Sequence, residues 1–418
     1  MTRLPQALAR LPLLLLGLIV SLAVLANATS RWLEQDFPEA ALTTNPLNSQ
    51  AVLNIGIKEF SGEPAAGRSK NFDLYRHAKD YAPADARLHS MLGIAKEAAG
   101  NAASAREDYS QALHLLPTEY QALARVFVQN VDERQYDEAA RKIELFVRRW
   151  PQLFGILRTY VIEMSLEKDG LTALEKLAIN FPKARQSLVG MIAGKNGNLP
   201  AAYDLVQKWH AGGVAPLQSE ILTVEKALIR QKRPNAAYEF FNSTRSESVS
   251  NAAGYIFNSD FALPFSGSVY DWRIRKQTGV TINRVEIQPD DQVPRERQHY
   301  LNVRFLGNPL QFRNIYQTIR LPSGTYRLEF LFAMNNLKTP KPLKFNLTCT
   351  DTREKLVTLE IPNGTSVASR LEALLTVPTG ECLFSTIEFN HAFVPLSFRN
   401  RFEGELNIHD IRLIRVSG

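Results

Sequence analysis

The chain has few of the residues that build metal and redox sites. Its 418 residues include two Cys and seven His. They form no Cys-x-x-Cys or His-x-x-x-His pair, which excludes the common zinc and thiol redox motifs, so we expect no metal site. The sequence also lacks a nucleophile elbow, a phosphate-binding loop and a dinucleotide fingerprint. We therefore expect no cofactor and no catalytic residue, and the protein is predicted not to be an enzyme.

Long apolar runs are also scarce, and the one that occurs lies at the N-terminus. It covers Leu11–Ala26, follows two arginines, and precedes the first acidic residue, Glu34. This is the charge pattern of an export signal whose N-terminal end stays in the cytoplasm. Residues 1–30 are therefore predicted to be a signal anchor or a signal peptide, with a linker over residues 31–49.

The sequence leaves open whether this segment is cleaved. Ala26-Asn27-Ala28 fits the small-x-small pattern of a signal-peptidase site. Arg31 and Trp32 instead fit the basic and aromatic anchor of a retained helix at the outer interface. The first reading places the protein free in the bacterial periplasm. The second places it in the inner membrane, which it contacts through its N-terminal segment, with its domains in the periplasm.

The charge and the cysteines fit an exported protein. The formal charge of +7 is spread over both halves of the chain, which indicates a mixed solvated surface and no nucleic-acid partner. Cys349 and Cys382 are separated by 33 positions, and an oxidising compartment favours a disulfide between them over two free thiols.

A period of 34 residues runs through the first half of the chain. It is visible in prolines and alanines that recur at this interval: Pro83, Pro117 and Pro151, and Ala105, Ala139 and Ala173. Such a period indicates stacked helical hairpins. Leu92-Gly93, Ala105, Tyr109 and Pro117 stand at the offsets of the tetratricopeptide pattern within Ala86–Glu119.

This segment resembles a tetratricopeptide repeat, and weaker copies extend the resemblance over residues 50–243. The resemblance implies an α-solenoid that binds a protein partner in its groove. Five arginines could line that groove and hold acidic segments, or could be solvated helix faces: Arg125, Arg134, Arg141, Arg148 and Arg149.

The pattern changes after a polar linker predicted over residues 244–256. Short alternating runs separated by Gly and Pro turns follow, which predicts an antiparallel β-sandwich over residues 257–418. The expected strands are Thr281–Ile287, Tyr300–Phe305, Tyr316–Leu321, Tyr326–Phe332, Lys344–Thr350, Lys355–Ile361, Ser385–Phe389 and Leu406–Val416. The fold class is thus multidomain: a membrane helix, a tetratricopeptide-like α-solenoid, and a jelly-roll sandwich.

Two segments resemble the jelly rolls of carbohydrate-binding modules. Tyr316–Phe330 is similar to their central hairpin and Glu405–Val416 to their final strand. The combination with helical repeats is similar to proteins of bacterial exopolysaccharide gene clusters. The resemblance implies a polysaccharide as a further partner.

A sugar site would need an aromatic platform with polar neighbours that hold the hydroxyls. The candidates are Tyr270, Trp272, Phe312, Tyr316 and Phe398, with Arg313 and Asn314. Each aromatic has an alternative role in the core or under a loop. Asp290-Asp291 is read either as a calcium loop or as a polar turn.

The leading hypothesis is a non-catalytic periplasmic scaffold that joins a protein partner on the repeats to a glycan on the sandwich, in exopolysaccharide synthesis or export. A structural interaction protein without sugar binding is the alternative. A glycan-processing enzyme is the third reading, because that chemistry needs two carboxylates, such as Glu381 and Glu388 or Glu403 and Glu405.

Overall fold

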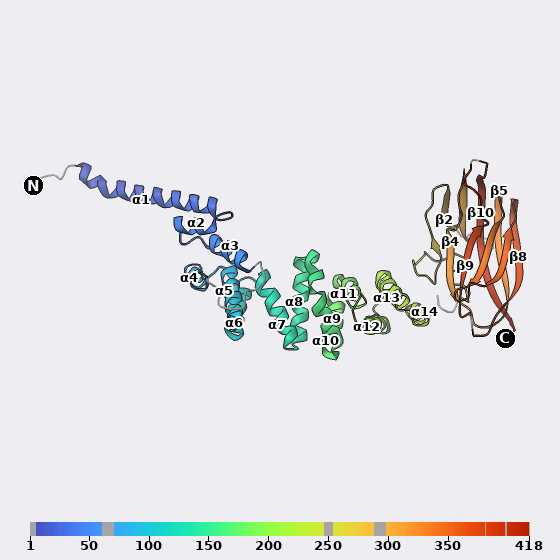
Figure 1. The fold of residues 1–418 in the computed structure, drawn as a ribbon, viewed down its shortest axis with the longest axis horizontal. Helices are drawn as coiled ribbons and strands as arrows, with labels where there is room; N and C mark the ends of the chain where they lie inside the picture. The colour runs from blue at the N-terminus through green and yellow to red at the C-terminus, as the bar shows by residue number, and fades with distance from the viewer. Residues whose placement is uncertain are drawn as a thin grey trace, which may run out of the picture. The chain divides into compact units, whose positions relative to one another are not determined.

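A computed structural model describes residues 6–60, 71–245, 254–287, 298–380, 382–397 and 399–417. The contacts divide the chain into two compact units, Met1–Met191 and Ile192–Gly418. Within the described residues, fourteen α-helices precede two antiparallel sheets of five strands each (Figure 1). The predicted fold class of a helical region followed by a β-sandwich is confirmed.

The first unit is helical throughout its described residues. Where the structure describes the connections between its α-helices, they include two 3-10 helices, η1 (Pro151–Leu157) and η2 (Pro182–Ala184). The helices are α1 (Gln6–Leu33), α2 (Pro38–Thr44), α3 (Ser49–Phe60), α4 (Phe72–Tyr81), α5 (Ala86–Ala98), α6 (Ala102–Leu115), α7 (Tyr120–Asp132), α8 (Tyr136–Arg149), α9 (Arg158–Leu166), α10 (Lys168–Asn180) and α11 (Arg185–Ile192).

Helix α1 contains a segment, Leu13–Leu33, whose 21 residues are long and apolar enough to cross a membrane. Its leucine, isoleucine and valine side chains from Leu13 to Leu25 are exposed. The N-terminal apolar helix is therefore either an anchor or a signal sequence.

The hairpin of α5 and α6 shows why small residues recur in the sequence. A Cβ atom on Gly93 would lie 2.5 Å from Cε1 of the Tyr109 ring, so only glycine lets this ring pack against α5. Tyr109 is fully buried, and its hydroxyl donates to Glu97 Oε2 at 2.6 Å. Tyr109 also shares a buried cluster with Ala122 of α7, so it contacts its own hairpin as well as the next one.

The next hairpin repeats this geometry. Helices α7 and α8 have the same lengths as α5 and α6, 13 and 14 residues. Gly100 and Arg134, the turn residues of the two hairpins, both have positive φ, 81° and 60°. A glycine adopts this conformation freely, whereas an arginine is held there by its surroundings.

The arginines of this region pair with nearby carboxylates. Arg125 lies 3.6 Å from Glu97, and Arg148 lies 2.7 Å from Glu144. Arg134 and Arg141 pair with glutamates in the same way. These partners favour the solvated-face interpretation over a groove that holds acidic segments.

The second unit contains three helices and the sandwich. The helices are α12 (Leu199–Ala211), α13 (Gln218–Arg230) and α14 (Pro234–Ser243). The strands are β1 (Arg273–Ile274), β2 (Val280–Glu286), β3 (His299–Asn308), β4 (Ile315–Arg320), β5 (Gly324–Lys338), β6 (Leu343–Cys349), β7 (Lys355–Ile361), β8 (Gly364–Val377), β9 (Phe384–His391) and β10 (Phe402–Ser417). Sheet A has the order β1-β4-β9-β6-β7 and sheet B the order β2-β3-β10-β5-β8.

An aromatic cluster joins the two sheets. Phe330 of sheet B lies 5.7 Å from both Phe345 and Phe389 of sheet A, between ring centroids, and all three side chains are fully buried. Such ring pairs add to the free energy of burial, so they fix which side of each strand faces inward.

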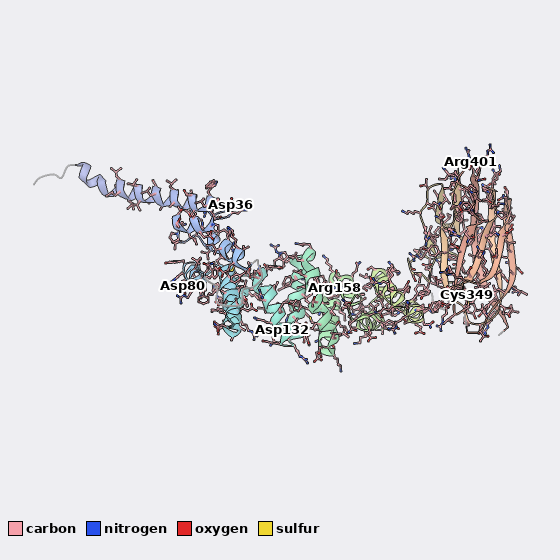
Figure 2. The ribbon with its side chains drawn as sticks, in the orientation of Figure 1. Asp36, Asp80, Asp132, Arg158, Cys349 and Arg401 are labelled. Atoms are coloured by element: carbon pink, nitrogen blue, oxygen red, sulfur yellow. A yellow bond between two sulfur atoms is a disulfide. The ribbon has the colours of Figure 1, made fainter. Side chains whose placement is uncertain are left out.

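Cys349 and Cys382 form a disulfide, as predicted. Cys349 ends β6, and Cys382 lies two residues before β9, at one end of the sandwich (Figure 2). The bond is consistent with an extracytoplasmic location.

The last two helices pack on the segment that leads into the sandwich. Glu225 of α13 is 1% exposed and accepts a hydrogen bond from the Val269 backbone at 2.9 Å. Tyr238 of α14 packs against Tyr270 and Phe384, with centroid distances of 5.2 and 6.1 Å. These helices and the sandwich therefore share a packed interface.

This interface predicts a pH dependence of stability. Burial raises the pKa of Glu225 above its usual value. A carboxyl with a raised pKa in the folded state binds its proton more tightly there, so its contribution to stability is lost as the pH rises through that pKa. Glu225→Gln keeps the acceptor for Val269 and removes the charge.

We expect the unfolding free energy of the second unit to decline less steeply in Glu225→Gln than in the wild type as the pH rises above 4.5, the ordinary pKa of a glutamate. Calorimetric unfolding of the chain at several pH values measures this. Glu239→Gln, an exposed change on α14, is the control. An equal decline in the wild type and in Glu225→Gln would contradict the assignment.

Candidate functional site

The structure places most of the predicted sugar-binding residues in the core. Trp272 is 1% exposed, donates from Nε1 to the Asn258 carbonyl at 2.9 Å, and packs on Phe261. Tyr270 is also buried and donates its hydroxyl to the Pro234 carbonyl at 2.9 Å. Neither ring has an open face for a sugar, so the structure favours the packing role that the sequence also allowed.

Of the four candidates in or near β4, two are buried and two reach solvent. Phe312 is buried against Phe305, with ring centroids 5.3 Å apart. Asn314 is buried and bonds to the backbone: its Nδ2 donates to the Arg275 carbonyl at 2.7 Å. Arg313 is exposed, and Tyr316 is half-buried. Among the described residues of the predicted sugar site, only Arg313 and Tyr316 reach solvent. Phe398, Glu381 and Asp290-Asp291 lie outside the described residues.

Tyr316 belongs to the outer face of sheet A, which carries a row of polar side chains. Inward residues of β4, β9 and β6 alternate with outward ones. The strand register aligns five residues of this face across the whole sheet: Arg273, Tyr316, Glu388, Asn346 and Thr358. Asn346 is buried among these neighbours, with 4% of its surface exposed, so it orients the polar groups around it.

The amide side chains of this face are held in fixed orientations. Asn346 Nδ2 donates to Asn390 Oδ1 at 2.8 Å, and Asn390 Nδ2 donates to Glu388 Oε2 at 2.8 Å. Thr358 Oγ1 donates to Asn346 Oδ1 at 2.8 Å. An amide nitrogen carries two N–H groups, so each asparagine uses only one in this chain.

A tyrosine ring and an arginine, Tyr316 and Arg275, lie beside these amides. The Arg275 guanidinium lies 4.7 Å from the Tyr316 ring centroid, and its Nε donates to the Tyr316 hydroxyl at 3.3 Å. The arginine stabilises the ring orientation and adds donors beside it. The outer face of sheet A, here Arg275, Tyr316, Asn346, Thr358, Glu388 and Asn390, is our candidate site.

Any solvent-facing side of an antiparallel sheet is polar, so the comparison with sheet B is informative. The outer face of sheet B carries charges that pair with one another. Arg327 lies 2.9 Å from Glu329, and Arg370 lies 3.8 Å from both Glu329 and Glu372. Sheet B also carries a bonded amide pair, Asn302 and Asn407, and sheet A also carries an ion pair, Lys344 and Glu360. What distinguishes sheet A is Tyr316, with the Arg273 and Arg275 guanidinium groups 5.5 and 4.7 Å from its ring centroid.

Neutral amides, a hydroxyl and one carboxylate beside an aromatic ring suit a ligand rich in hydroxyl groups. Hydroxyls both donate and accept, so they complement amides and a carboxylate. Within the described residues, no group of three or more His, Cys, Asp or Glu residues could hold a metal ion. The sequence pointed to Tyr316 but not to the asparagines. Asn346 alternates with core residues inside the predicted strand Lys344–Thr350, and Asn390 lies one residue beyond the predicted strand Ser385–Phe389.

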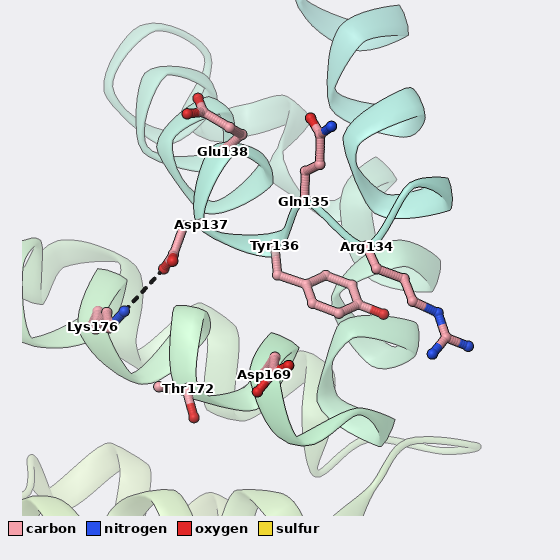
Figure 3. Close-up of a pocket in the computed structure, with 8 residues that line it drawn as sticks. All are labelled: Arg134, Gln135, Tyr136, Asp137, Glu138, Asp169, Thr172 and Lys176. Atoms are coloured by element: carbon pink, nitrogen blue, oxygen red, sulfur yellow. Dashed lines mark hydrogen bonds and ion pairs between the residues drawn. The ribbon is translucent and has the colours of Figure 1, made fainter.

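The first unit contains a separate polar groove of about 320 Å³. It lies between the start of α8 and the start of α10 (Figure 3). Asp137 and Lys176 form an ion pair across it at 3.2 Å, and Arg134, Tyr136 and Asp169 also line it. This groove presents charges of both signs.

No family model matches the chain, and no curated protein matches it. Solved structures with a similar fold include the carbohydrate-binding module CBM4, 16% identical, covering 38% of this chain and 99% of that one, with a TM-score of 0.27. A CBM61 module in complex with beta-1,4-galactotriose is 20% identical, covers 39% and 98%, and has a TM-score of 0.26.

A third similar structure is a module of a Cellvibrio mixtus lichenase in complex with cellotriose. It is 14% identical, covers 35% of this chain and 98% of that one, and has a TM-score of 0.22. At these scores the likeness does not identify a ligand.

Proposed function

We propose that this protein is a non-catalytic, periplasm-facing scaffold that binds glycan on the outer face of sheet A. The row of hydrogen-bonded polar side chains beside Tyr316 carries this proposal. The amides are already oriented by their mutual hydrogen bonds, so little side-chain freedom is lost when a ligand binds.

The helical hairpins support a second binding role. Their lengths, their positive-φ turns and the packing of Tyr109 on Gly93 agree with tetratricopeptide repeats. Repeats of this kind bind partners along their surfaces. We propose that the repeats hold a protein partner while the sandwich holds glycan, in the setting of exopolysaccharide synthesis or export.

The alternative of an enzyme receives less support from the carboxylates. Glu405 lies 3.5 Å from Arg304 and is thus neutralised by an arginine. Glu388 is bonded to Asn390. A glycosidase requires two carboxyl groups that face each other across the scissile bond, whereas Glu388 and Glu405 each bond to a different side chain, Asn390 and Arg304.

The glycan proposal is tested with the full chain on an array of neutral oligosaccharides, followed by calorimetric titration of the best ligand. We expect Tyr316→Ala to weaken binding by about tenfold or more, since it removes the half-buried ring that would contact the ligand. Asn390→Ala breaks the hydrogen-bond chain between Asn346 and Glu388, and should also weaken binding.

Tyr300→Ala is the matched control, because Tyr300 is a half-buried tyrosine on sheet B. It should leave the affinity unchanged. Absence of any saturable ligand, or equal losses from Tyr300→Ala and Tyr316→Ala, would reject the outer face of sheet A as the site and leave the structural interaction protein as the better reading.

We also propose that α1 is retained as a membrane anchor. The helix continues through Ala26-Asn27-Ala28 to Leu33, whereas a signal-peptidase site must be accessible as extended chain. Asn45 Nδ2 donates to Asn27 Oδ1 at 3.1 Å, and the buried Ser30 donates to the Ala41 carbonyl at 2.8 Å. These bonds join the end of α1 to α2 and its following loop.

Intact mass and N-terminal sequencing of the protein from its membrane fraction check this prediction. We expect the chain to retain α1 and to remain in the membrane after a carbonate wash. A mature N-terminus at Thr29 would show that α1 is a cleaved signal.

A further inference from the structure

Five loops meet at the end of the sandwich that Arg401 marks, opposite the end that Cys349 marks (Figure 2). The strand register places them together. Asn308 at the end of β3 pairs with Phe402, and His391 at the end of β9 pairs with Leu343. The loops connect β1 to β2, β3 to β4, β5 to β6, β7 to β8 and β9 to β10. We call this end the basic end.

The loops of the basic end are strongly cationic. They contain no Asp or Glu, and six basic residues, all with exposed side chains: Arg275, Lys276, Arg313, Lys341, Arg399 and Arg401. At the other end, the loop between β6 and β7 holds Arg353 between Asp351 and Glu354. The loops at the Arg401 end are therefore more basic than the loop between β6 and β7.

The same end presents large apolar side chains to solvent. Phe393 is 79% exposed and Leu396 is 70% exposed, both in the loop between β9 and β10. Leu306, near the end of β3, is 51% exposed. Single exposed apolar residues are common, but two in one loop, with a third near the end of β3 and basic residues around them, mark an interaction surface.

Bonds beneath the loop keep these side chains outward. Val394, between the two, is 5% exposed, and its carbonyl accepts a hydrogen bond from Gln311 Nε2. Asn400 Nδ2 donates to the Pro395 carbonyl at 2.9 Å. At the base of the loop, His391 Nε2 accepts from the Phe312 backbone at 2.9 Å. Because Val394 is buried and hydrogen bonds hold the loop, the side chains of Phe393 and Leu396 face solvent.

We propose that the basic end docks on a membrane surface that carries anionic lipid. Phe393 and Leu396 enter the interfacial layer, while the surrounding arginines and lysines lie over the lipid phosphates. Anionic headgroups attract basic residues, and buried apolar side chains supply the second contribution that stable membrane binding needs. A hydrated polyanion would use the basic residues but would leave the apolar pair exposed to water.

This surface is distinct from the outer face of sheet A, with only Arg275 near both. Membrane docking therefore stands or fails independently of glycan binding. A sandwich held at the membrane through its loops would leave the outer face of sheet A open to a ligand.

The experiment uses the full chain, held through α1 in nanodiscs of phosphatidylcholine, so that α1 is already embedded. Sucrose-loaded vesicles are added, made either of phosphatidylcholine alone or of phosphatidylcholine and phosphatidylglycerol, and are sedimented. We expect sedimentation only with vesicles that contain phosphatidylglycerol.

Two variants test the two contributions separately. Lys276→Gln/Lys341→Gln/Arg399→Gln should weaken vesicle binding by about 100-fold, from about fivefold for each basic residue. Phe393→Ser/Leu396→Ser should weaken it by more than about tenfold through lost apolar burial. The controls are Arg353→Gln/Lys355→Gln at the other end, and Val367→Ser/Leu374→Ser, two exposed apolar residues on β8. Both controls should bind as the wild type does.

Several outcomes overturn the proposal: no sedimentation, equal sedimentation with both kinds of vesicle, or an equal loss in the controls. Binding that depends on the basic residues but is unchanged by Phe393→Ser/Leu396→Ser also overturns it, because charge alone then accounts for the attraction and a soluble polyanion becomes the ligand.

Discussion

The packing of Phe330 against Phe345 and Phe389 is the contact on which the surfaces of the sandwich depend. Side chains of a strand alternate between its two faces, so burying these rings also fixes which neighbours point outward. Asn346 follows Phe345, and Glu388 and Asn390 flank Phe389. A register slip of one residue would carry the amides into the core and expose the rings, at a large free-energy penalty. The core therefore determines the composition of the candidate site.

The same constraint explains how one small domain can offer two different surfaces. The strands are fixed in register by the core, and the faces and the loops are then free to differ in chemistry. Sheet A presents amides beside a tyrosine ring, sheet B presents ion pairs and a bonded amide pair, and the loops of the basic end present basic residues beside exposed apolar side chains. Such a division suits a scaffold that contacts several partners at once.

The sequence predicts the regular parts of this structure well. The hairpin predicted within Ala86–Glu119 is present, because Gly93 and Tyr109 encode a close helix contact that few other residues allow. Strand β7 has the predicted bounds, but β8 was missed: its Ala, Ser, Leu and Glu residues do not alternate like those of a half-buried strand. This segment becomes a strand because it pairs with β5, a segment that lies apart from it in the sequence and next to it in the folded sheet.

The candidate site was less predictable. An aromatic residue beside a strand has the same appearance in sequence whether it is buried or exposed, so Trp272 and Phe312 could not be separated from Tyr316 without the structure. The outward asparagines were visible as polar residues between core residues. Only the register shows that Asn346 of β6 lies beside Glu388 of β9.

The most direct test of glycan binding on sheet A observes its amides. Selective ¹⁵N labelling of asparagine in the full chain reports the side-chain NH₂ signals during titration with the best array ligand. The account predicts that the signals of Asn346 and Asn390 shift, while those of Asn302 and Asn407, a bonded pair on sheet B, stay in place. Shifts of Asn302 and Asn407 with Asn346 and Asn390 unchanged would contradict it.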